Sequence, residues 1–188
     1  MPVYIAAMGP RNLRLTGEVA DGWLGNAFIP ESAEVFLEPL REGAESAGRT
    51  LADLDLVAPV AVEFHNSAQD TAAAARRHAD GYAFTIGAMG TGGTNFYNDA
   101  FTRLGYGEQV TEVARLWQSG HRDEARAAVP LDLGRLTNLL GSTTEVAERI
   151  AAHRDTGINT LLAKIDGDHN HQLRTIERLL EAVALSVS

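Results

Sequence analysis

The sequence predicts an α/β protein with a parallel sheet, because strand-like runs alternate with helical segments along the chain. Four β-rich runs are expected near residues 3–7, 23–28, 56–64 and 159–165, and a helical pattern follows each of them. Four strand-helix units in a row are typical of a parallel sheet, either open and doubly wound or part of a closed barrel. A closed barrel of this class needs eight strands, so this chain would supply half of one.

The first unit joins a short strand to a helix through Ala7-Met8-Gly9-Pro10. Pro10 suits the first turn of a helix, where its missing N–H would have no partner. The turn before it can present free backbone N–H groups at the positive end of the helix dipole, a place that attracts phosphate. A tight turn without a ligand is the alternative, since one glycine is a weaker signal than the three of a dinucleotide fingerprint.

Start and stop signals bound the next elements. Pro30 opens a second helix, and Gly48 ends it in the left-handed conformation common at C-caps. Ser67, with Asp70 three residues later, resembles a capping box, and a third helix is expected over 72–79. Pro59 lies within the third apolar run, and because proline removes a ladder hydrogen bond we expect a bulge or the strand start there.

Regular alternation stops between about residues 82 and 140, a segment interpreted as an insertion that holds two helices. Its glycines between 87 and 93 lack the Gly-Lys-Ser/Thr of a nucleotide loop and predict a mobile lid or connector. Order resumes where Ser142 and Glu145 form a capping box. The last helix carries one apolar stripe, made of Leu173, Ile176, Leu180, Val183 and Ala184.

Composition limits the classes of partner. The chain has 188 residues, 45% of them hydrophobic, and a net charge of -9, which disfavours nucleic acid and anionic membranes as partners. It has no cysteine, and its first residues lack the basic start and apolar core of a signal peptide. We therefore expect a single domain over 1–188 and a cytoplasmic location.

The chemistry-bearing residues do not assemble into a catalytic motif. Asp166-Gly167-Asp168-His169-Asn170-His171 follows the last strand and could suggest a metal, but Asp168 is a natural N-cap, so no metal site is expected. His65 ends the third strand, a sensible place for an acid or base. Phe96, Tyr97 and Asn98 could line a pocket or simply pack. No catalytic residue is assigned.

Several segments resemble the luciferase-like monooxygenase superfamily, in its branch of deazaflavin (coenzyme F420)-dependent oxidoreductases. They occur in the family's order over nearly the whole chain. They are residues 2–10, Ala20-Asp21-Gly22-Trp23, residues 95–101, Arg103-Leu104-Gly105-Tyr106, and the stretch from Leu136 through Ile158.

The resemblance implies a (β/α)8 barrel of the TIM type, of which this chain is the C-terminal half: the fifth to eighth strands, with a helical insertion before the last. It also implies that Ala7, Met8, Gly9 and Pro10 receive the phosphate of the cofactor, coenzyme F420 or alternatively FMN. Asn26 matches a position on the substrate side of the pocket.

The implied activity is hydride transfer between the deazaflavin and a small organic substrate. The first four strands, which in the family hold the cofactor ring and the acid-base residues, have no match here, so we expect little or no turnover by this chain alone. One alternative is a non-catalytic fragment or interaction module, working as a homo-oligomer or with the missing N-terminal half. Another is an FMN-dependent monooxygenase.

Overall fold

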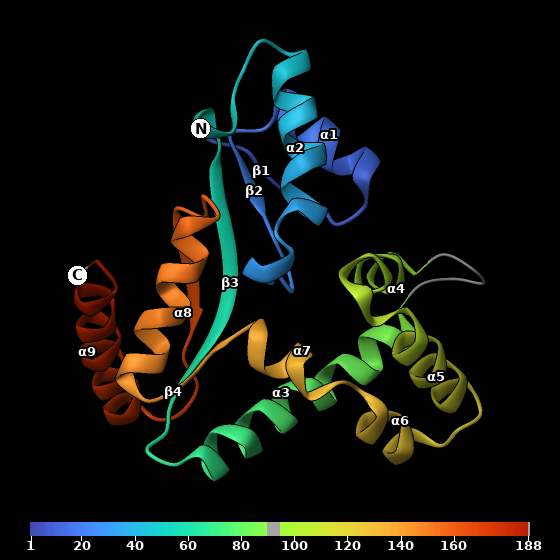
Figure 1. Cartoon of the computed structure of the whole chain (residues 1–188), viewed down its shortest axis with the longest axis vertical. Coiled ribbons are helices and arrows are strands. Elements are labelled where there is room, and N and C mark those ends of the chain that lie inside the picture. The colour runs from blue at the N-terminus through green and yellow to red at the C-terminus, as the bar shows by residue number, and fades with distance from the viewer. Residues whose placement is uncertain (90–94, 188) are drawn as a thin grey trace.

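The computed structural model describes residues 1–89 and 95–187, which contain a five-stranded parallel sheet with helices packed on it (Figure 1). Strand β3 is central and pairs with β2 and β4 along one edge and with β5 along the other. Strand β1 pairs with β2. The strands are β1 (Tyr4–Ala6), β2 (Gly22–Leu24), β3 (Asp55–Phe64), β4 (Leu139–Gly141) and β5 (Thr160–Lys164).

Helices follow each of the strands β1, β2, β3 and β5, as the sequence predicted. These are α1 (Pro10–Val19), α2 (Glu34–Ser46), α3 (Ala68–Ala88) and α9 (His169–Ser186). Between α3 and β4 the described residues form α4 (Phe96–Phe101), a π-helical turn η3 (Thr102–Tyr106), α5 (Gly107–Gln118), α6 (Arg122–Ala128) and α7 (Leu131–Leu136). Helix α8 (Thr143–Asp155) links β4 to β5, and short 3-10 turns lie at η1 (Pro30–Ser32) and η2 (Leu51–Asp53).

Three details of the sequence prediction were wrong. Strand β4 was missed, because it has three residues and its side chains are buried under helices. Helix α3 is longer than the expected 72–79 and runs through residue 82, where the insertion was placed. More helices than the expected two follow it. Of the predicted glycine-rich lid, residues 90–94 lie outside the described part of the chain.

Pro59 also corrects the prediction, because β3 passes through it without a bulge and pairs it with Leu162 of β5. The backbone groups of Asp55, Ala61 and His65 bond toward the edge that carries β2 and β4. Successive backbone N–H groups of a strand point to alternate edges. Pro59 is an even number of residues from these three, so its missing N–H would have faced the same edge. The pairing with β2 ends at Val57 and the pairing with β4 starts at Val62, so Pro59 faces the gap between them and no ladder bond is lost.

Helices α1 and α2 pack with their backbones in contact, next to β1 and β2 (Figure 1). A Cβ added at Gly17 would lie 2.1 Å from the Leu40 carbonyl oxygen, and one added at Gly43 would lie 2.0 Å from that of Arg14. Only glycine permits this approach. The two glycines therefore set the distance between the two helices.

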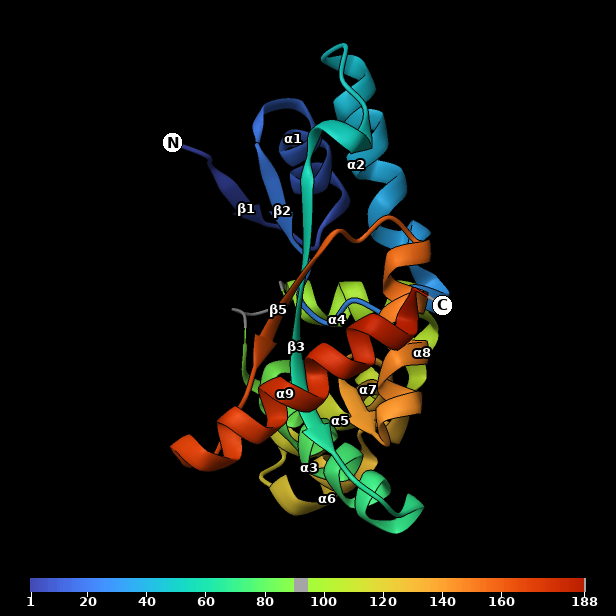
Figure 2. The same cartoon turned by 90° about the vertical axis from the view of Figure 1, so that its left-hand side faces the viewer.

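The sheet has one buried and one open face. Leu56, Ala58, Val60 and Val62 of β3 are buried in the two main apolar clusters under the helices. On β1 and β5 most side chains are exposed, Leu162 among them at 56%. Figure 2 shows β5 beside β3, with α9 crossing the same region.

Candidate functional site

The turn between β1 and α1 ends in an uncapped helix N-terminus. Gly9 is the N-cap residue, with extended backbone angles (φ -81°, ψ 144°), and Pro10 occupies the first helical position. Gly9 has no side chain to cap the helix, and the first turn contains no acidic residue. The N–H groups of Arg11 and Asn12 are therefore available to an anion, and the helix dipole adds positive potential there.

Space for a ligand lies directly against this turn. A Cβ added at Gly9 would have no described atom within 4 Å, so the backbone is approachable from outside. A cavity of about 300 Å³ opens beside it, at the carboxyl ends of β1 and β2 and next to the start of α4. Its lining residues are Ala6, Ala7, Met8, Gly9, Asn12, Leu24, Asn26, Phe96 and Tyr97.

The structure thus brings together most of the predicted site. Ala7, Met8, Gly9 and Asn26 line one cavity, whereas Pro10 is exposed and outside the lining. Asn12 was not singled out from the sequence, although its place in the first turn of the predicted helix was a usable signal. Phe96 and Tyr97 line the cavity, and Tyr97 also packs 6.5 Å from the ring of Phe101.

An aromatic cluster supports the turn from beneath. The buried Trp23 indole N–H donates a 2.9 Å hydrogen bond to the Ala7 carbonyl oxygen. The Trp23 ring packs against Phe28 and Phe36, with ring centroids 5.9 and 5.7 Å away. The backbone of the turn is therefore fixed to the core before any ligand arrives.

A second support comes from Arg103, in the π-helical turn η3. Its guanidinium donates to the Met8 carbonyl oxygen and, at 3.1 Å, to that of Val35, and lies 5.8 Å from the Phe36 ring centroid. Burial lowers the pKa of Arg103, although the nearby Asp99 carboxylate opposes this shift. Since arginine stays protonated after such a shift, a fixed positive charge lies behind the turn. Sequence reasoning missed this role.

Asn26 lines the cavity just after the end of β2. The next residue, Ala27, has a φ of 53°, a left-handed conformation that costs an alanine energy. The strand predicted to reach residue 28 ends at Leu24 because the chain turns here. This turn presents Asn26 at the rim while Ala27 and Phe28 return to the core.

Two other polar clusters share no lining residue with this cavity. Glu63, at the end of β3, accepts from Arg77 at 2.6 Å and pairs with His78 at 2.7 Å and His65 at 3.2 Å. Burial alone would raise the pKa of Glu63, but the His78 hydrogen bond and the Arg77 charge outweigh it and lower that pKa. His65 is at the strand end as predicted, and its ring is engaged by Glu63.

The segment from Asp166 to His171 behaves as the capping interpretation predicts. The Asp168 carboxylate accepts a 2.8 Å hydrogen bond from the His171 backbone N–H at the start of α9. Among residues 1–89 and 95–187, no group of three or more His, Asp or Glu side chains is arranged to hold a metal ion. Within the same residues, no helix has the length and apolarity needed to cross a membrane.

Comparison with known proteins identifies the relatives of this chain. The sequence model of the family Luciferase-like monooxygenase matches residues 1–160. A Mycobacterium tuberculosis protein that carries the name coenzyme F420-dependent oxidoreductase is 32% identical over 164 residues, covering 86% of this chain and 46% of that protein. The 5,10-methylenetetrahydromethanopterin reductase of Methanopyrus kandleri is 45% identical over 58 residues, which are 31% of this chain and 17% of the reductase.

Solved structures confirm the fold. The coenzyme F420-dependent tetrahydromethanopterin reductase from Methanopyrus kandleri superposes with a TM-score of 0.69 at 23% identity, covering 94% of this chain and 49% of that one. An F420-dependent secondary alcohol dehydrogenase, solved with an F420-acetone adduct, gives 0.65 at 18% identity and covers 97% and 49%. This chain spans about half the length of these relatives, whose fold is the TIM barrel. It belongs to the luciferase-like monooxygenase family.

Proposed function

We propose that this chain is the cofactor-phosphate half of an F420-dependent oxidoreductase. The observation that carries the proposal is the uncapped, open N-terminus of α1 at Gly9, which adjoins a cavity at the carboxyl ends of β1 and β2. The donor set fits a phosphate group: free backbone N–H groups, a helix dipole and the half-buried Arg103 charge behind Met8. The choice of a deazaflavin rests on the F420-dependent names of the relatives.

The residues of this chain would bind and orient the cofactor. Gly9, Arg11 and Asn12 would receive the phosphate through the backbone, with Ala7, Met8 and Pro10 shaping the turn. Asn26 would face the substrate, a small organic molecule. When bound, the deazaflavin supplies hydride transfer to or from such a substrate, while the protein contributes position and electrostatics.

The chain would bind this cofactor without turning it over. About half of each relative has no counterpart here, and no described residue at the cavity is a convincing acid or base. Activity would then need the other four strand-helix units, or a partner that replaces them. The alternative of a non-catalytic fragment predicts binding to other chains and no binding of either cofactor. We retain the cytoplasm as the expected location.

FMN is the second candidate cofactor. Backbone N–H groups recognise a phosphate without reading the ring attached to it, so the turn cannot distinguish the two cofactors. The F420-dependent names of the relatives favour the deazaflavin. Parallel titrations with F420 and FMN, followed by the fluorescence of each cofactor, would separate them.

A pair of variants at one residue tests the site. Gly9→Asp would cap α1 with its own carboxylate, raising stability by a few tenths of a kcal/mol, and would repel the phosphate. We expect its affinity for F420 to fall by about 10-fold or more, equivalent to about 1.4 kcal/mol. Gly9→Ala, whose added Cβ meets open space, is the matched control and should bind within about 2-fold of the native chain.

Unfolding curves for both variants accompany the titration. Equal affinity of the two variants for F420 would contradict a phosphate site at this turn. Absence of F420 and FMN binding to the native chain would contradict the proposed function itself.

A further inference from the structure

Both ends of the sheet have an unpaired strand edge. In the order β1-β2-β3-β5, no described strand pairs with the outer edge of β1 or with the outer edge of β5. Free N–H and C=O groups along such an edge favour the addition of another strand. Every pairing in the sheet is parallel, so a strand that continues the pattern must run in the same direction.

Beside the free edge of β5, helix α9 exposes its apolar stripe. The residues of α9 that are buried are Thr175 and Ala182, whereas Leu180 is 64% exposed and Val183 43% exposed. At 100° per residue, the stripe that Leu180 and Val183 share with Leu173 and Ile176 lies about a quarter to almost half a turn from that buried side. Most of the apolar face of α9 therefore points past the sheet, and Val183 borders the space between α9 and β5.

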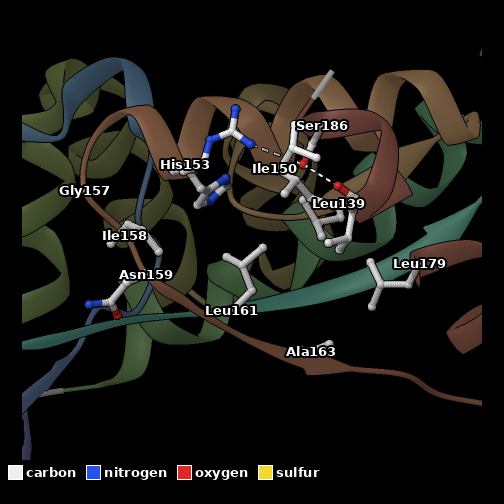
Figure 3. Close-up of a pocket in the computed structure, with 13 residues that line it drawn as sticks. Leu139, Ile150, His153, Gly157, Ile158, Asn159, Leu161, Ala163, Leu179 and Ser186 are labelled. Carbon is white, nitrogen blue, oxygen red and sulfur yellow. Dashed lines mark hydrogen bonds between the residues drawn. The ribbon is translucent and has the colours of Figure 1, made fainter. Parts of the chain in front are cut away.

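The packing beneath α9 is incomplete. A cavity of about 620 Å³ lies between α8, α9 and β5. Figure 3 shows Leu139, Leu161 and Leu179 around it, contributed by β4, β5 and α9. This space is open to the surface, so the described chain leaves part of the gap between α9 and the sheet unfilled.

The opposite edge has a matching surface. Helix α1 exposes Leu15 (49%) and Val19 (63%), which lie one turn apart. They are on the side of α1 away from Gly17, whose backbone contacts α2. A free strand and an exposed apolar helix face thus occur at both ends of the sheet, and the two ends are not copies of one another.

We propose that these two ends belong to one interface, formed by a second copy of this chain. A two-fold rotation about the axis of a barrel would place β5 of one copy beside β1 of the other, and it would do so twice. The strands β1, β2, β3 and β5 of two copies make the eight that close such a barrel. Each α9 stripe would then cover Leu15 and Val19 of the partner copy.

Closure also explains the open face of the sheet. Tyr4 of β1 and Leu162 of β5 are exposed on the face that a closed barrel turns inward. Pairing like edges, β5 with β5, would instead set the strands antiparallel and leave both β1 edges free. Unlike pairing keeps every strand parallel and leaves no edge unpaired. The inference does not depend on the cofactor.

The test uses the full chain and two opposite charge substitutions. Sedimentation velocity over a micromolar concentration series should give twice the mass of one chain for the native protein. Leu180→Lys and Val19→Glu, one on each side of the interface, should each give single chains. An equimolar mixture of the two variants should recover the dimer, because one interface then pairs the introduced lysine with the introduced glutamate while the other is native.

The control is Leu131→Lys, at an exposed leucine on α7 that lies on neither edge. It should remain dimeric, and circular dichroism should show native helix content for all three variants. The inference is overturned by a native chain that stays single across the series, as it would if only a different four-stranded half fits these edges. It is also overturned if Leu180→Lys stays dimeric, or if the mixture stays dissociated.

Discussion

The β1–α2 end of the molecule and the β5–α9 end are made of the same strand-helix units, yet they differ in packing. At the first end, α1 and α2 meet backbone to backbone, and Trp23 and Arg103 fix the turn at Ala7 and Met8. At the second end, α9 exposes most of its apolar stripe above a cavity. The comparison teaches that the turn at Ala7 and Met8 is fixed by contacts within this chain, whereas no described residue covers the apolar stripe at the far edge.

A substitution at the contact between α1 and α2 should cause the largest loss of stability. Gly43→Ala would place a Cβ 2.0 Å from the Arg14 carbonyl oxygen, where only movement of whole helices gives relief. We expect the free energy of unfolding in urea to fall by about 3 kcal/mol or more. Gly81→Ala, also inside a helix but with no described atom within 4 Å of the new Cβ, should raise it by about 0.5–1 kcal/mol. Similar values for both would refute tight packing at this end.

Replacing Arg103 should cause a smaller loss of stability, together with a loss of F420 affinity. Arg103→Met keeps the length of the side chain and removes its donors to Met8 and Val35, leaving two carbonyl groups without them. We expect unfolding to become easier by about 2 kcal/mol and F420 affinity to fall with it. The control Arg115→Met breaks a surface pair with Glu112 and should change stability by less than about 0.5 kcal/mol. Unchanged F420 affinity in Arg103→Met would show that the turn needs no such support.

At the β5–α9 end, His153 lines the cavity between α8, α9 and β5, and its titration is sensitive to water there. Its ring is 1% exposed, one nitrogen bonds to the Arg149 carbonyl oxygen, and Nε2 has no partner among the described residues. Burial lowers the pKa of His153 below its ordinary value, although the bond to Arg149 opposes this. A ring titration followed by NMR should therefore give a pKa below about 6.5. A value at or above it would mean that water fills the cavity.

The sign of the stability effect follows from this shift. Below about pH 6.5 the unfolded chain binds a proton at His153 while the folded chain does not. The free energy of unfolding therefore decreases as the pH is lowered, until the pKa of His153 in the folded chain is reached. The slope that His153 adds is at most about 1.4 kcal/mol per pH unit. His153→Phe should show a shallower decline between pH 7 and pH 5. An unchanged slope would contradict a depressed pKa.

The sequence was sufficient for elements whose signals are local. The caps at Gly48, Ser142 and Asp168 are confirmed, because each depends on a few neighbouring residues. Strand β4 was missed since its three residues acquire their role only by pairing with the end of β3. The extension of α3 to Ala88 was missed because its buried residues pack on helices distant in sequence, which overrode Gly81.

The site divides in the same way. The turn at Gly9 and the helix start at Pro10 were predictable, because a strand, a Gly-Pro step and a helix are contiguous in the chain. Arg103 was not, since it reaches Met8 across 95 positions of sequence. The exposure of the α9 stripe was equally hidden: periodicity shows that a helix has an apolar face, and not whether the chain itself contains the surface that covers it.

Pro59 restricts the register of β3, the central strand of the sheet. In the observed pairing, the ring nitrogen of Pro59 points to the edge of β3 that carries β2 and β4, in the gap between these two strands. A slip by a single residue would turn that nitrogen toward β5 and rotate Val60 and Val62 into water. An imino acid in the central strand thus disfavours any sheet in which β3 is shifted by one residue, in addition to the cost of exposing its apolar side chains.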